Sequence, residues 1–529
     1  MITGNHKNPI SERRARFILA LVILAFALFT SLNLLAKYQG YADLPDLLVF
    51  ETLLHNTLRG DFMYAFREGD VCHLGIHFSP LLLIYLPFYA VYQHVFTLFL
   101  VQGLWVGMGA AAAYLLGRKY FRSRGAALIM AAALLINPIV TGAVLWSIHE
   151  DLLAFPLLMF ALYFFVKRKI SLFWLFIFLA LLSKEFISLV VFFTGPALWW
   201  RFRNRKEAAK TGILLMALGL GWFFLTTRVL MPLFSPMSLS DLQISARFDP
   251  RIGHSVPEMA GNFFRHPLFF IRTILQKPKI LYLVKMLLPF AFACILSPAL
   301  LLPVLPVALM NLLSHKVLWH STLLHQYTIP AAPFLFIAAI DGFRRLRAII
   351  WRKRKKGGGL SLYRHLRTGY FPAILLLAFS LIGFFVSDVD EWALHTKDKR
   401  KKHLNLFSRE SRKTAEKALA VIPPDAAVSA SFLVANHLAK RKIIHYNREP
   451  EITILPYEYF VIVKGGMKGD APESFSEETI EFFREKCEPV FARGRFLVLK
   501  RKTPPPSLEE FRDSVRDKLE RMKKQGSFK

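Results

Sequence analysis

The residues best suited to catalysis or binding lie in short polar segments between long apolar ones. The segment 146–151 is the densest of these, because His149, Glu150 and Asp151 follow one another directly. Imidazole and carboxyl groups serve as general acids and bases, and both bind cations. The segment predicts a functional site at a helix end, with a simple helix cap as the alternative interpretation.

Lys184 and Glu185 form a second charged pair, which interrupts the apolar run 175–193. Ionisable residues are costly at membrane depth and commonly mark functional sites. We expect the Lys184 ammonium to face an anionic lipid phosphate, with Glu185 setting its charge state. An exposed tip between two short helices is the alternative.

Asp46 stands directly before the apolar segment 47–55. This position places its carboxyl group at the start of an amphipathic helix, where the helix dipole and partial burial tune a pKa. A carboxylate in that setting can deprotonate a hydroxyl group. We therefore predict that Asp46 is a general base, and that Asp43 is a solvated loop acid.

Histidines supply the remaining candidates. His77 comes directly before Phe78-Ser79-Pro80 and is either a structural hydrogen-bonding group or a substrate ligand. A later segment combines His315, Lys316, His320, His325 and Tyr327. It contains no HxxxH pair with a supporting carboxylate, so its mixture of groups favours a phosphate or pyrophosphate partner over a metal ion.

The sequence lacks several common nucleotide, nucleophile and metal signatures. It contains no Walker loop, no GxGxxG motif that opens a helix, no GxSxG motif and no zinc signature. Cys72, Cys294 and Cys487 have no metal-binding spacing and are expected to be unpaired, with a bridge between Cys72 and Cys487 on the exported side as the alternative. We predict no cofactor and no metal ligands, while the carboxyl groups leave a divalent metal open.

Long apolar blocks must position these groups. The chain has 529 residues, of which 54% are hydrophobic, and its mean hydropathy is +0.38. The block 17–36 carries no charge and is long enough to cross about 30 Å of hydrocarbon. We predict an all-α polytopic membrane bundle of about eleven spans. The spans are expected at 17–36, 95–117, 124–142, 150–166, 170–184, 186–200, 211–231, 280–297, 299–314, 327–342 and 370–388.

Charged loops orient the bundle. Basic residues are concentrated at 7–16, 118–124, 167–169, 201–210 and 343–369. These loops all fall on one side if the N-terminus is cytoplasmic, and the acidic segment 37–78 is then exported. The net charge of +31 therefore reflects orientation and contact with lipid headgroups, which argues against a nucleic-acid partner.

Changes in composition predict the domain boundaries. Strand-like and helical segments alternate after residue 388, which is typical of a small α/β domain. Two apolar, aromatic segments, 78–93 and 232–279, are expected to lie in the membrane interface. The predicted parts are a cytoplasmic basic N-terminus (1–16), a transmembrane domain (17–388, with the first exported loop at 37–94), an extracytoplasmic α/β domain (389–502) and a Pro-rich turn with a basic amphipathic helix (503–529).

The order of these segments resembles the GT-C superfamily of membrane glycosyltransferases. Over residues 15–500 the chain more closely resembles a family of predicted bacterial and archaeal multi-pass membrane proteins of unknown function. The likeness rests on Asp46, His77-Phe78-Ser79-Pro80, the Gln102 helix, Ile148-His149-Glu150, Lys184-Glu185, the hairpin 299–314, His325-Gln326-Tyr327 and the segment 422–431. Two features depart from the pattern: Leu47-Leu48 replaces Leu-Gly after the loop Asp, and the paired acids of many GT-C enzymes are missing.

The resemblance implies a polyprenyl-phosphate-linked sugar as donor and a glycan, lipid or protein as acceptor. Transfer would take place on the extracytoplasmic face of a bacterial or archaeal cytoplasmic membrane. Asp46 would deprotonate the acceptor hydroxyl for inverting attack, and Lys184, His149 and His325 would stabilise the departing phosphate. The implied substrate and phosphate ligands are His77, His149, Glu150, Lys184, Glu185, His325 and Tyr327.

Two other classes of function are compatible with the same topology. A transporter or flippase of a lipid-linked or small solute would show internal two-fold symmetry with charges at the membrane midplane. A non-catalytic membrane scaffold would present a large apolar patch on the residues after 388. A cavity with Asp46 at its base would instead favour the transferase.

Overall fold

The computed structural model describes residues 10–42, 44, 46–66, 71–121, 123–235, 247–253, 256–315, 322–354, 368–387, 389, 407–447, 456–464, 475–510 and 513. The chain divides into two compact units. The first contains residues 1–35 and 74–398, and the second contains residues 36–73 and 399–529. Each unit is described by itself below.

The first unit is helical. Its elements are α1 (Glu12–Gln39, ending in the second unit), η3 (Pro80–Tyr85), α3 (Leu86–Val91), α4 (Val95–Phe121), α5 (Arg124–Ile136), α6 (Pro138–Trp146), α7 (Asp151–Val166), α8 (Ile170–Leu181), α9 (Ile187–Arg201), α10 (Lys206–Leu225), η4 (Thr226–Leu230), α11 (Met231–Phe234), α13 (Val256–Arg265), α14 (Pro267–Ile274), α15 (Lys277–Leu287), η5 (Leu288–Phe290), η6 (Ala293–Leu296), η7 (Pro298–Val304), α16 (Leu305–Leu313), η8 (Gln326–Ala331), α18 (Ala332–Arg354) and α20 (Tyr370–Val386).

Three helices among the described residues are long and apolar enough to cross a membrane alone: Glu12–Gln39, Val95–Phe121 and Lys206–Phe234. The pair α5 and α6, bent by 43° at Asn137, makes a fourth if it forms one span. Several shorter apolar helices accompany them, including α7, α8, α9 and α20. These apolar helices support the prediction that the chain is a membrane protein. The count of about eleven spans stays a prediction.

The predicted span 280–297 is wrong as a single helix. Helix α15 ends at Leu287, and the chain continues as the short 3₁₀ turns η5 and η6. Ala291 and Phe292, between these turns, have φ angles of 51° and 54°. Two successive non-glycine residues in the left-handed region cannot continue a right-handed helix. The segment 280–297 is apolar, as the prediction assumes, but its composition does not reveal the break at Ala291 and Phe292.

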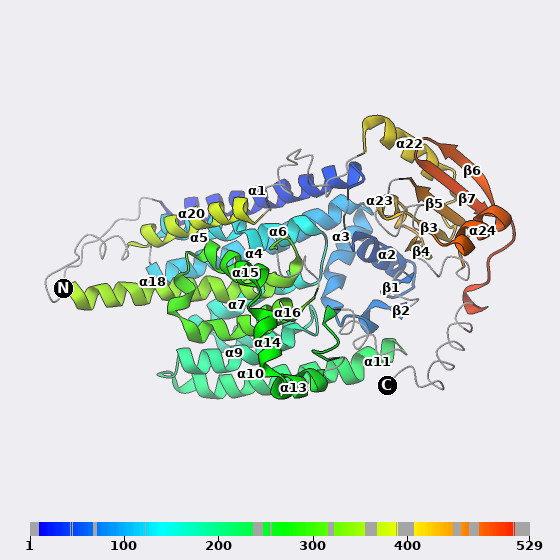
Figure 1. Cartoon of the computed structure of the whole chain (residues 1–529). Helices are drawn as coiled ribbons and strands as arrows, with labels where there is room; N and C mark the ends of the chain where they lie inside the picture. The colour runs from blue at the N-terminus through cyan, green and yellow to red at the C-terminus, as the bar shows by residue number, and fades with distance from the viewer. Residues whose placement is uncertain are drawn as a thin grey trace. The chain divides into compact units, whose positions relative to one another are not determined.

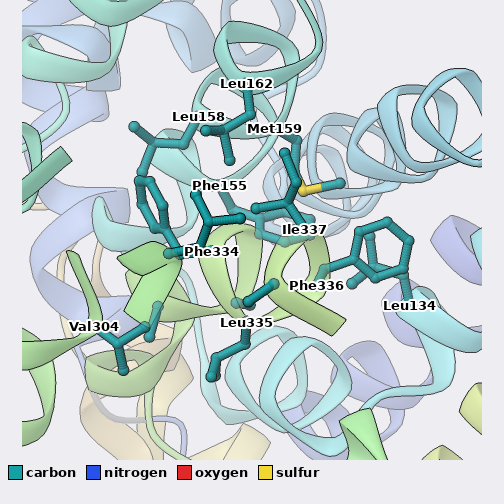
Figure 2. Close-up of a cluster of buried hydrophobic side chains, with 14 of the residues drawn as sticks. Leu134, Phe155, Leu158, Met159, Leu162, Val304, Phe334, Leu335, Phe336 and Ile337 are labelled. Atoms are coloured by element: carbon teal, nitrogen blue, oxygen red, sulfur yellow. The ribbon is translucent and has the colours of Figure 1, made fainter. Parts of the chain in front are cut away.

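The core of the first unit lies around α7 and α18. Both helices are buried over much of their length, and Phe155, Leu158, Phe334 and Leu335 are at most 1% exposed. Figure 2 shows side chains of α7 and α18 together with Leu134 of α5 and Val304 of η7 in this cluster. A helix that is apolar on all sides needs such surroundings. The short α7 is thus enclosed by protein on nearly all sides.

Helices α9 and α10 run side by side (Figure 1) because glycines allow their backbones to approach closely. A Cβ atom added at Gly195 would lie 2.4 Å from the Gly212 carbonyl oxygen, and one at Gly212 would lie 2.8 Å from that of Gly195. Small residues at helix crossings are typical of packing in membranes. The pair carries Lys184 and Glu185 just before α9.

The second unit contains a five-stranded mixed sheet in the order β4-β3-β5-β7-β6. Strand β3 (Val428–Ala430) is parallel to β4 (Ile444–Tyr446) and β5 (Tyr459–Val463), while β7 (Phe496–Arg501) is antiparallel to β5 and β6 (Cys487–Arg493). Helices α22 (Arg409–Ala420), α23 (Phe432–Ala435) and α24 (Glu477–Lys486) accompany the sheet (Figure 1). The predicted small α/β fold after residue 388 is confirmed.

The first loop after α1 is part of this second unit. Helix α2 (Leu47–Leu58) and the hairpin of β1 (Tyr64–Ala65) and β2 (Val71–Cys72) belong to it. The Thr52 hydroxyl donates to the Ala439 carbonyl at 2.8 Å, and the Asn436 amide donates to the Leu44 carbonyl at 3.2 Å. Tyr41 and Leu48 are buried in the same core as the sheet. The contacts thus join residues 36–73 to the C-terminal region, while the predicted boundary at 388 stays a prediction.

Candidate functional site

The ends of four helices bring the principal charged residues of the first unit together. His149 and Glu150 lie between the end of α6 at Trp146 and the start of α7, and Asp151 is the first residue of α7. Lys184 and Glu185 lie in the turn between α8 and α9. His77 lies just before η3. We call His77, His149, Glu150, Asp151, Lys184 and Glu185 the charged cluster.

Lys184 connects the two segments that the sequence singled out separately. Its Nζ lies 2.7 Å from Glu150 Oε1 and 2.8 Å from Asp151 Oδ2. The exposed fractions are 0% for Glu150, 3% for Asp151 and 6% for Lys184. Buried charges are stable only when they are paired, so each of these groups depends on the others. The solvated-tip alternative for Lys184 is therefore wrong.

His149 contacts both carboxylates through one ring nitrogen. Its Nδ1 lies 2.9 Å from Glu150 Oε2 and 3.1 Å from Asp151 Oδ2. Its Nε2 forms a 2.7 Å hydrogen bond with the Gln326 amide, and its backbone N–H donates to Gln102 Oε1 at 3.2 Å. Gln326 therefore contacts the ring of His149, and Gln102 holds its backbone.

Glu185 forms a second layer of the charged cluster with His77. The His77 Nδ1 to Glu185 Oε1 distance is 2.9 Å, and the Phe78 backbone N–H donates to Glu185 Oε2 at 3.0 Å. His77 Nε2 lies 3.9 Å from Glu150 Oε1, so the histidine stands between two carboxylates. The segment before η3 is thereby tied to the turn before α9.

His325 and Tyr327 lie beside the charged cluster. The His325 ring meets the Trp146 ring edge-on, with centroids 4.1 Å apart. The Tyr327 ring centroid lies 6.5 Å from that of His149 and 6.1 Å from that of His325. Arg247 lies over the Tyr327 ring, with its Cζ 4.4 Å from the centroid. An arginine in this arrangement adds positive charge next to the acidic residues.

Asp46 belongs to the second unit. It is the residue before α2, as predicted, and its side chain is partly buried without capping the helix by a hydrogen bond. Its φ of 64° places it in the left-handed region, which aspartate tolerates better than most residues. Its role as a base, and its proximity to the charged cluster, stay predictions. Of the later histidine segment, Lys316 and His320 lie outside the described residues.

Some residues of the site have no role assigned from the sequence alone. Asp151 and Gln326 lie within the segments that the sequence singles out, but only their contacts with Lys184 and His149 show what they do. Arg247 was missed, because the segment 232–279 was interpreted as interfacial. A single arginine held against an aromatic ring has no local sequence signal. Its carbonyl accepts from the His315 backbone N–H at 3.2 Å, so a contact distant in sequence positions it.

Comparison with known proteins gives a family but not an activity. No curated protein sequence matches the chain. Among solved structures, ArnT from Cupriavidus metallidurans in the apo state is similar, with 14% sequence identity and a TM-score of 0.45, over 89% of this chain and 97% of that chain. The sequence profile of a family described as a predicted membrane protein (DUF2079) matches residues 42–465. This match covers most of the sequence, and the chain therefore belongs to the DUF2079 family of predicted membrane proteins.

Proposed function

We propose that the chain is an integral membrane glycosyltransferase of the GT-C type. It transfers a hexosyl or pentosyl group from a polyprenyl-phosphate donor to a glycan, lipid or protein on the extracytoplasmic face. The observation that carries the proposal is the charged cluster, in which Glu150, Asp151 and Lys184 are buried within a membrane protein. Ionisable groups in such surroundings are expensive and are typical of functional sites. The resemblance of the segment order to the GT-C pattern supports the class of reaction.

The proposed reaction needs one base and one stabilised leaving group. The Asp46 carboxylate takes the proton of the acceptor hydroxyl, whose oxygen bonds to the anomeric carbon. The bond from that carbon to the donor's phosphate oxygen breaks, and the polyprenyl phosphate leaves with the electron pair. The attack comes from the opposite face, so the configuration of the anomeric carbon is inverted. This scheme requires the acceptor hydroxyl and Asp46 to be on the same, exported side.

The positive charge for the leaving phosphate is the second requirement. The charge of Lys184 is already balanced by Glu150 and Asp151, so we assign Lys184 the role of holding these two carboxylates in place. His325 and Arg247, which both lie next to Tyr327, are the groups that we propose to face the phosphate. His77, His149 and Glu185 then orient this region through their hydrogen bonds and charge contacts.

Replacing the base tests the proposal. We expect Asp46→Asn in the full-length protein to lower the rate of polyprenyl-phosphate release by about 10²- to 10⁴-fold, the usual contribution of a general base. The measurement uses proteoliposomes and a panel of radiolabelled polyprenyl-phosphate sugars with simple acceptor alcohols. The matched control is Asp61→Asn, because the Asp61 carboxylate forms an exposed pair with Lys442 at 2.9 Å. It should retain the wild-type rate.

The same vesicles separate the alternatives. A wild-type rate with Asp46→Asn would contradict the assignment of the base. Movement of an intact labelled lipid between leaflets, with no release of polyprenyl phosphate, would identify a flippase. If no donor of the panel is either cleaved or moved between leaflets, the result would favour a non-catalytic scaffold.

A further inference from the structure

The charged cluster contains the ligand set of a divalent metal. One ligand atom from each of His149, Glu150 and Asp151 lies within 4.8 Å of the others. An imidazole nitrogen with two carboxylate oxygens is a common donor set for Zn²⁺ and related ions. All three side chains are buried, and the Gln326 amide holds the outer nitrogen of His149 at 2.7 Å. In known metal sites the outer ring nitrogen donates its proton, so the Gln326 amide would accept through its oxygen when a metal is bound at Nδ1.

A cation already contacts these carboxylates. The Lys184 ammonium lies 2.7 Å from Glu150 Oε1 and 2.8 Å from Asp151 Oδ2. A zinc ion on the same oxygens would need distances of about 2.0 to 2.2 Å. The ion would therefore stand next to the ammonium, and two cations in a buried site repel strongly. The residues present do not fit a divalent metal while Lys184 is in place.

Lys184 is held at this position from both sides. The Ser183 hydroxyl donates to the Ala180 carbonyl at 2.5 Å, and the Lys184 carbonyl accepts from the Ile187 backbone N–H at 3.1 Å. The next residue, Glu185, is anchored by the Phe78 backbone and by His77. These contacts fix the backbone of the turn that carries Lys184, and the two carboxylates hold its ammonium.

We infer that the Lys184 ammonium takes the place of a divalent cation in this protein. His149, Glu150 and Asp151 form a metal site that is closed by Lys184 and opens when its amine is removed. The wild-type protein consequently needs no divalent ion at the charged cluster. This inference concerns binding and does not rest on the proposed sugar transfer.

Zinc binding to the full-length protein in detergent micelles tests the inference. The probe is Zn²⁺ in equilibrium dialysis, with bound zinc measured by mass spectrometry. We expect K184A to bind one additional equivalent compared with the wild type, and K184A/E150Q to lose that equivalent, because metal affinity requires the full ligand set. The double variant also subtracts zinc held by histidines elsewhere on the chain.

Two results would overturn the inference. One is a folded K184A protein, monodisperse on gel filtration, that binds no more zinc than K184A/E150Q. The other is a wild-type protein that binds one equivalent more than the E150Q variant, since the site would then be open with Lys184 in place. This second comparison needs no substitution of Lys184. If K184A does not fold, K184M keeps the volume of the lysine stem and gives the same contrast. A failure of sugar transfer would leave these zinc measurements unaffected.

Discussion

His437 is stacked against two tyrosine rings in the second unit. Its ring centroid lies 4.1 Å from that of Tyr38 and 3.9 Å from that of Tyr41, and its Nε2 donates to the Tyr38 carbonyl at 3.0 Å. Burial lowers the pKa of His437 from 6.5 to about 4, because the charged form would lose its hydration. The histidine is therefore neutral in the folded unit over most of the physiological range.

This histidine makes the second unit sensitive to acid. Below pH 6.5 His437 is protonated in the unfolded chain, whereas in the folded unit it is protonated only below about pH 4. The free energy of unfolding should therefore fall as pH decreases through this window, by up to about 3 kcal/mol. Hydrogen exchange of the β3 and β5 amides in the full-length protein, at pH 7 and pH 4.5, measures the change.

His437→Gln should remove most of this pH dependence. His445→Gln is the matched control, because His445 hydrogen-bonds locally to the Tyr446 carbonyl, and it should keep the wild-type slope. An unchanged slope in His437→Gln would show that another group is responsible.

Single residues of the charged cluster were visible in the sequence, but their pairing was not. His149, Glu150, Lys184 and Glu185 each stood out as polar groups in apolar surroundings. The contact between Asp151 and Lys184 joins residues 33 positions apart, and only the geometry of two turns decides it. Lys184 was therefore expected to face a phosphate, whereas it faces two carboxylates. Local patterns identify buried charge, but they do not identify its partner.

At the scale of elements, Asp341 also shows that a local sequence pattern does not identify the partners of a buried charge. It lies within the predicted span 327–342 and was not singled out, although a carboxylate in an apolar run is a signal by itself. Its carboxylate accepts from Arg201 Nε at 2.7 Å, from the Ser297 hydroxyl at 2.8 Å and from Arg345 Nε at 3.0 Å. These bonds connect α9 and the turn before η7 to α18. Helix positions follow from apolar blocks, whereas such cross-links depend on the packing.

Two glycines of α10 differ sharply in how closely α9 approaches them. A Cβ atom at Gly219 would lie 2.6 Å from the Phe192 backbone nitrogen and 2.6 Å from the Ser188 carbonyl oxygen. A Cβ atom at Gly221, on the same helix, would meet nothing within 4 Å. The two positions therefore form a matched pair.

We expect Gly219→Ala to lower the free energy of unfolding by about 1 to 3 kcal/mol, because the two helices must move apart. Gly221→Ala should leave the free energy of unfolding unchanged or raise it by up to about 1 kcal/mol, since alanine restricts the unfolded chain. Thermal unfolding of the two variants in the same detergent compares them. Equal melting temperatures would contradict the close approach of α9 and α10.

At the scale of the whole molecule, the second unit is built from two distant parts of the chain. Its core contains Tyr41 and Leu48 together with Val428 and Val461. The sequence predicted the α/β fold after residue 388 from alternating strands and helices. It did not predict that α2 completes this fold, because an apolar helix next to a span is equally typical of a membrane interface.

A fragment of residues 399–529 should therefore not fold stably alone. It lacks the apolar face of α2 and the hydrogen bonds that join Thr52 to Ala439 and Leu44 to Asn436. A chain in which residues 36–73 are fused to residues 399–529 through a flexible linker should fold. Circular dichroism and hydrogen exchange of the strand amides distinguish the two. Equal protection of β3 in both proteins would show that α2 is dispensable.

Because the second unit is built from two distant segments, its folding must wait for the synthesis of the second segment. Helix α2 leaves the ribosome before residues 74–398, and its partner strands follow only after them. At roughly 5 to 20 residues per second, on the order of 20 to 75 seconds pass between the synthesis of α2 and that of β3. During this interval the apolar side chains of α2 have none of their final neighbours from the sheet. The fold of α2 is therefore completed only after the intervening residues 74–398 have been synthesised.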